Sequence, residues 1–139
     1  MTDIEIAKKG LAGHSICLCK DGVSFTDDGR GISPMMRAIA EGKDLAGYSA
    51  ADVIVGKAAA MLFVKAGIVC VHGNVMSEAG KDFLDSHGIP NTCDTLTDRI
   101  INRQGTDICP MEKAVAGISD IEQGYSALEA KRRELMQKK

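Results

Sequence analysis

Residues 49–71 read SAADVIVGKAAAMLFVKAGIVCV and are the most informative part of the chain. The segment from Lys57 to Ala66 contains three successive alanines and ends at Gly67, a pattern typical of a helix that lies close against a sheet. Residues 68–71 are a short apolar run rich in β-branched side chains, which indicates a strand covered on both faces in a parallel sheet. A helix that runs directly into such a strand predicts an α/β protein.

Two interpretations are open for residues 49–56. Ser49, with Asp52 three residues later, resembles the start of a helix. Residues 53–55, Val-Ile-Val, favour a strand instead. In both interpretations the helix proper begins at Lys57.

The segments before residue 49 alternate between helix and strand patterns. Residues 3–11 have apolar side chains at helical spacing. Residues 15–26 form two alternating runs around Asp21-Gly22, which is a strong hairpin-turn signal. Ser33-Pro34 opens another helix, because proline at the first helical position gives up an amide that has no partner there.

The alternation continues after residue 71. Further elements are expected over residues 77–88 (helix), 89–96 (extended), 110–115 (helix) and 120–139 (the last helix). The whole order predicts a three-layer α-β-α fold with a mixed four- to five-stranded sheet.

Composition and charge limit the classes of protein that the chain can belong to. Of its 139 residues, 45% are hydrophobic and 26% are charged, which predicts a single globular domain over residues 1–139. The net charge of −2 argues against binding to nucleic acids or to a membrane surface, because both depend on a strong basic excess. The nearly uncharged run over residues 53–64 is broken by Lys57 and is too short to cross a bilayer.

The cysteines and the N-terminus predict a reduced, cytoplasmic protein. Five cysteines are an odd number, and none forms a Cys-x-x-Cys pair. Cys17 and Cys19 would share one strand face about 7 Å apart, too far for a disulfide, so we expect buried thiols. Residues 1–9 have no apolar core of signal-peptide length. We assign no role to the three histidines, because no Asp or Glu partner for a metal site or a triad is evident: His14, His72 and His87.

Three motifs in order resemble a known family. They are DGRGISP at 28–34, VGKAAAML at 55–62 and INRQGTDICPME at 101–112. Together they are similar to a small prokaryotic family of unknown function, and the resemblance covers most of the chain. That family is similar in fold to cytidine deaminases, so the resemblance implies a cytidine-deaminase-like arrangement of the predicted elements.

The residues that a zinc deaminase needs are replaced at the matching positions. Such an enzyme holds zinc through a His or Cys in H-x-E and two thiolates in P-C-x-x-C, and the Glu moves protons. Lys57 and Ala59 stand where the first motif would be, and Met76 and Ala79 stand where the thiolates would be. These side chains cannot build a tetrahedral zinc site. We therefore expect no metal, no cofactor and no zinc-dependent deamination.

Lys57 and Arg30 are the first two candidates for a ligand site. A lysine in the first turn of a helix opposes the helix dipole, a cost that an anionic ligand would offset. A side chain that simply reaches solvent explains Lys57 equally well. Arg30 lies between two glycines, where its guanidinium could bind a phosphate or carboxylate, although an ordinary exposed turn is an alternative.

Cys109 and Arg103 are the other two candidates. Cys109 precedes Pro110 at a predicted helix N-terminus, where the dipole favours a thiolate. Glu112 opposes that effect and is alternatively a cap of the same helix. Arg103 would complete an anion site or lie on the surface.

Three hypotheses for function follow. The first is a zinc-free, deaminase-like domain that binds a nucleotide or a related phosphorylated small molecule through Arg30, Lys57, Arg103 and Cys109. The second is an enzyme of another class, in which Lys57 or Cys109 attacks an electrophilic carbon. The third is an interaction module that works through residues 120–139. That helix would form a homodimer contact if its apolar stripe were left uncovered.

Overall fold

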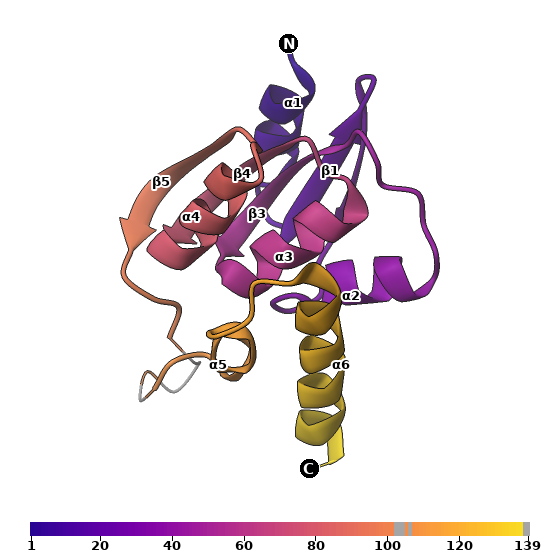
Figure 1. Ribbon diagram of the computed structural model, residues 1–139. Coiled ribbons are helices and arrows are strands. Elements are labelled where there is room, and N and C mark those ends of the chain that lie inside the picture. The colour runs from indigo at the N-terminus through magenta and orange to yellow at the C-terminus, as the bar shows by residue number, and fades with distance from the viewer. Residues whose placement is uncertain (102–104, 106, 138–139) are drawn as a thin grey trace.

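The computed structural model describes residues 1–101, 105 and 107–137 (Figure 1). Its helices and strands alternate as follows: α1 (Asp3–Gly10), β1 (Ile16–Lys20), β2 (Val23–Asp27), α2 (Ser33–Ala40), β3 (Ser49–Val55), α3 (Lys57–Ala66), β4 (Cys70–Ser77), α4 (Glu78–Ser86), β5 (Asn91–Thr97), α5 (Pro110–Val115) and α6 (Ile121–Gln137). In the described part of the chain the strands form one five-stranded sheet in the order β2-β1-β3-β4-β5. The predicted α/β class and mixed sheet are confirmed.

The sheet is antiparallel on one side of β3 and parallel on the other. β1 pairs antiparallel with both β2 and β3, while β3, β4 and β5 run parallel. The main core lies between the sheet and the layer that contains α2, α3 and α4, and α6 packs on α3 beyond it. The opposite face of the sheet carries α1 (Figure 1).

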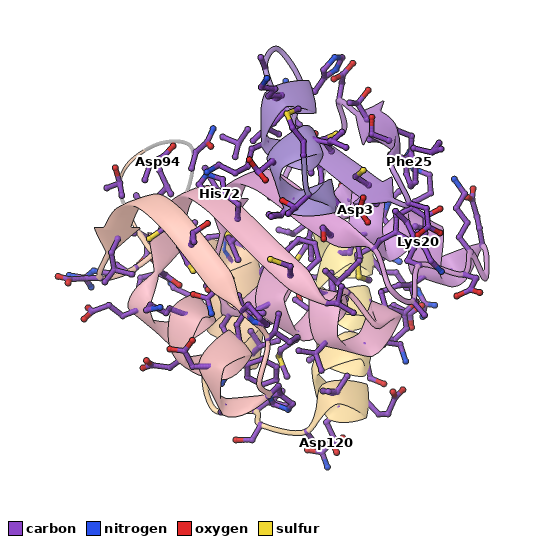
Figure 2. All side chains as sticks on the ribbon, turned by 90° about the horizontal axis from the view of Figure 1, so that it is seen from above. Asp3, Lys20, Phe25, His72, Asp94 and Asp120 are labelled. Carbon is purple, nitrogen blue, oxygen red and sulfur yellow. The ribbon has the colours of Figure 1, made fainter. Side chains whose placement is uncertain are left out.

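The hairpin and α1 form one unit on that opposite face. Asp21 and Gly22 both have positive φ, 53° and 80°, as a two-residue hairpin turn of the predicted kind requires. The Asp3 carboxylate at the start of α1 accepts hydrogen bonds from the amides of both turn residues, each at 3.0 Å (Figure 2). Beneath α1 the thiols of Cys17 and Cys19 are buried and free, as expected.

β3 resolves the alternatives for residues 49–56. Ser49 begins a strand that pairs with Cys70 on β4, so the helix start at Ser49 was the wrong interpretation. Asp52, which suggested a helix cap, lies inside this strand between Ile16 on β1 and Gly73 on β4. The helix α3 begins at Lys57 and ends at left-handed Gly67, as predicted. Cross-strand pairing on both sides outweighs a weak local capping signal.

β4 is longer than residues 68–71 suggested. It runs through His72 to Ser77, and His72 accepts or donates a 2.8 Å hydrogen bond at Thr92 on β5. The Nε2 atom of His72 also lies 3.7 Å from the Asp94 carboxylate. Figure 2 shows the two residues next to each other. This histidine therefore has acidic and hydroxyl partners that the sequence did not reveal.

The last helix, α6, is partly covered within the same chain. Leu128 is fully buried, and Ile121 and Tyr125 pack against the core. Leu135, nearer the C-terminal end, remains 38% exposed. Within the described residues no helix is both long and apolar enough to cross a membrane.

Candidate functional site

Two adjacent cavities open where β3 ends. We call the first the apolar cavity, and its volume is about 490 Å³. Its large apolar lining residues are Ile32, Ile54, Ile100, Ile101, Met111 and Leu135. We call the second the acidic cavity; its volume is about 650 Å³, and its ionisable lining is His14, Asp28, Arg30 and Asp52. Both share Arg30, Gly31 and Ile54. The carboxyl end of a strand where connectivity changes direction is a common ligand position in α/β proteins.

The Glu112 carboxylate, from α5, occupies the N-terminus of α3. It accepts hydrogen bonds from the amides of Lys57 at 2.8 Å and Ala58 at 3.0 Å. These donors have no partner within the helix, so the carboxylate caps it from a distant segment. A Cβ atom on Gly56 would lie 2.5 Å from the same carboxyl group, so glycine is what lets Glu112 approach. Burial raises the pKa of Glu112, while the two amides and the Lys57 charge oppose that rise.

Lys57 lies outside both cavities. Its Nζ donates a hydrogen bond to the carbonyl oxygen of Ala116 at 3.3 Å, just beyond α5. The anion that we expected beside this lysine is the chain's own Glu112. The helix-dipole argument for an external ligand at Lys57 therefore has an internal explanation. The sequence offered Glu112 as a cap of its own helix, α5. In the structure the Glu112 carboxylate caps α3 instead.

Arg30 and Cys109 both line the apolar cavity. Arg30 follows a tight turn in which the amide of Gly29 donates to the Asp27 carboxylate at 2.7 Å. That carboxylate also pairs with Arg37 on α2 at 2.8 Å, which fixes the start of the loop. Cys109 is the residue before α5 and is half-buried. Arg103, the remaining candidate, lies outside the described residues.

His14 and Asp28 form a pair at the acidic cavity. The Nδ1 atom of His14 lies 2.7 Å from Oδ1 of Asp28, fourteen residues away. His14 therefore has one acidic neighbour, which the spacing of the sequence did not indicate. The β1–β2 hairpin separates the two residues in sequence and returns the chain, so that its two ends meet.

Asp52 is the buried acid of this cavity. Only 8% of the residue is exposed, and its Oδ1 accepts a hydrogen bond from the Ile54 amide at 3.4 Å. Burial raises the pKa of Asp52 to about 8. Among the described residues, no basic nitrogen lies within 4 Å of its carboxylate. An acid inside an otherwise apolar strand was the available sequence signal, because aspartate is rarely buried without a partner.

Within residues 1–101, 105 and 107–137, no three His, Cys, Asp or Glu side chains are grouped so that they could hold a metal ion. Met76, at a position matched to a zinc thiolate, is buried in the main core. The ionisable groups that the described residues contribute to the two cavities are an arginine, a thiol, a histidine and three carboxyl groups.

The fold and the two cavities define a small α/β domain with a divided pocket at the carboxyl end of β3. The sequence model of the DUF1893 family, a domain of unknown function, matches residues 6–131, and the chain belongs to this family. The crystal structure of a DUF1893 family protein from Thermotoga maritima is similar, with a TM-score of 0.82 and 21% sequence identity. The alignment covers 94% of this chain and 92% of that one. No curated protein matches the sequence.

These comparisons confirm the expectation of a prokaryotic family of unknown function. At 21% identity, the likeness to the Thermotoga maritima protein shows a shared fold and carries no activity with it.

Proposed function

We propose that this protein is a zinc-free, deaminase-like domain that binds a nucleotide or a related phosphorylated small molecule in the divided pocket. The observation that carries the proposal is the position of Arg30, which lines both cavities at their shared border. A phosphate bound by Arg30 would leave the rest of the ligand free to enter either cavity.

Arg30 has the properties of an anion-binding side chain. No carboxylate oxygen of the described residues lies within 4 Å of its guanidinium. A guanidinium offers five donors in a planar fork that matches two phosphate oxygens. Gly31, the next residue, lines both cavities without a side chain and has a φ of 54°, a left-handed conformation that glycine adopts without strain. The loop thus presents a charge and an open approach together.

The apolar cavity supports a ligand with a flat, apolar part. Its volume of about 490 Å³ falls within the usual range for small-molecule sites, roughly 300–1,000 Å³. Ile54 and Met111 line it from β3 and α5, so two separate elements would enclose a ring placed between them. A nucleobase has the required shape and surface.

The deaminase-like part of the proposal rests on the order of elements and on what replaces the catalytic groups. The resemblance implies a particular order of elements, and the structure has this order: a helix, a hairpin, a second helix, and then strands that alternate with helices. At the matched positions, Ala59 and Met76 are buried apolar side chains, and Lys57 points to a backbone carbonyl. Because these three residues replace the zinc ligands and the proton carrier, we propose a protein that binds its ligand without zinc-dependent deamination.

An enzyme that uses Cys109 is the second candidate. Cys109, Glu112 and Arg30 line one cavity, so a thiol, a carboxyl group and an anion-binding group face the same space. Lys57 is less suited to the same role, since its amine contacts the Ala116 carbonyl. Loss of turnover in Cys109→Ala with unchanged ligand affinity would support this candidate over simple binding.

Calorimetric titration with paired nucleosides and nucleoside monophosphates tests the main proposal. We expect the monophosphates to bind more tightly than their nucleosides, and Arg30→Gln to remove that difference. Arg133→Gln, on the exposed surface of α6 and outside both cavities, is the matched control for loss of one charge. Equal affinity of the Arg30→Gln and Arg133→Gln variants for the monophosphates would refute the role of Arg30.

A further inference from the structure

The carboxyl groups of the acidic cavity are not needed to explain phosphate binding at Arg30. Asp28 and Asp52 line it together with His14, and Arg30 stands at its border with the apolar cavity. We infer that the acidic cavity binds a cationic amine or amidine group of the same ligand, with Asp52 as its counter-ion. This inference rests on the proposed function, since Arg30 would hold the phosphate of that ligand.

Asp52 is the observation that points to a cation. Asp52 lines the cavity although 92% of the residue is buried, and the hydrogen-bond donors to its carboxyl group are backbone amides of its own strand. A buried carboxylate without a positive partner is costly, and most proteins supply a lysine or arginine at such a place. Here the described chain supplies none within 4 Å, while the cavity leaves room for one on a ligand.

The second carboxylate strengthens the same preference. Asp28 is largely exposed at the mouth of the cavity, where its contact with His14 holds it in place. Asp28 lowers the electrostatic potential of the cavity, and Asp52 adds to this once a bound cation has ionised it, whereas Arg30 raises the potential at the border. A ligand with one anionic and one cationic end would therefore bind in a single orientation, with its phosphate at Arg30 and its amine toward Asp52.

Binding of a cation should release a proton. Burial raises the pKa of Asp52 to about 8, so at pH 7 this carboxyl group is mostly protonated in the free protein. A bound ammonium group favours the ionised form, so binding should release a proton from Asp52 at pH 7. The other charged or titratable groups that face the cavity are His14, Asp28 and Arg30, and a variant of Asp52 separates its contribution from theirs.

Two probes that differ in one group test the inference: 4-aminobutyl phosphate and butyl phosphate. Isothermal titration at pH 7, in two buffers of different ionisation enthalpy, gives the affinity and the proton release for each. We expect the amino probe to bind about tenfold more tightly, because a charge-assisted hydrogen bond contributes that much. Asp52→Asn, which keeps the shape of the neutral acid, should abolish both the preference and the proton release.

The outcomes separate this inference from the proposed function. Equal binding of the two phosphates to the wild-type protein would overturn the inference and leave phosphate binding at Arg30 intact. Binding of neither phosphate would overturn both. A preference for the amino probe that survives in Asp52→Asn would also overturn the inference, because the cation would then pair elsewhere. The comparison of probes uses the wild-type protein, so it holds even if the variant folds poorly.

Discussion

Replacing Asp52 by asparagine should stabilise the protein by an amount that grows with pH. The pKa of Asp52 is about 8 in the folded protein, against 3.8 for an ordinary aspartate. The folded state therefore keeps a proton that the unfolded state loses, and the stability of the wild-type protein falls as pH rises from about 4 to about 8. Each pH unit in this window costs about 1.4 kcal/mol. Asparagine has no such cost, so the variant should gain about 4 kcal/mol over the wild type at pH 7.

Urea unfolding followed by circular dichroism at pH 5, 6, 7 and 8 measures this effect. The quantity of interest is the difference in free energy of unfolding between Asp52→Asn and the wild type, since other titrating groups cancel in it. Asp44→Asn, at an exposed aspartate in the loop before β3, is the matched control for loss of one surface carboxyl group. A difference for Asp52→Asn that is the same at all four pH values would refute the argument that this carboxyl group is held neutral by burial.

Three further predictions concern the packing around the site. Glu112→Ala leaves two amides of α3 without an acceptor and should lower the free energy of unfolding by about 1–3 kcal/mol in urea titrations. Gly56→Ala places a methyl group 2.5 Å from the Glu112 carboxyl group and should lower the melting temperature by several degrees. Gly117→Ala, which meets no atom within 4 Å, should change it little, and equal effects of the two glycine variants would contradict the crowding argument. The thiols of Cys17 and Cys19 are buried and burial raises the pKa of each, so both should react with a thiol reagent only at the rate of unfolding; rapid labelling of either in the native protein would show that α1 does not cover them.

Most elements of the fold could be predicted because their signals are local. Asp21-Gly22 fixes the hairpin turn, and Pro110 marks the start of α5 at the residue where the helix begins. The start of β3 was less certain, because its identity as a strand depends on pairing with β1 and β4 rather than on its own residues. Local propensity is a weak guide where both neighbours of a strand contribute its stability.

The site was harder to predict, because its contacts join distant parts of the chain. Glu112 caps a helix that begins 55 residues earlier, and no spacing rule links the two segments. His14 and Asp28 meet across a hairpin, and Asp52 is identified as buried only after its strand is placed in the middle of the sheet. Arg30 and Cys109 could be selected from single-residue arguments, and the structure brings them to one cavity.

The cap that Glu112 places on α3 provides a built-in reporter of the cavity wall. Amide protons at the beginning of a helix usually exchange quickly with solvent, because no carbonyl of the helix protects them. Those of Lys57 and Ala58 are protected by a side chain from α5, which also carries part of the lining of the apolar cavity. Their exchange rates in deuterium oxide therefore follow the separation of α5 from α3, and a ligand that wedges these helices apart would be detected as faster exchange at two backbone positions that it never contacts.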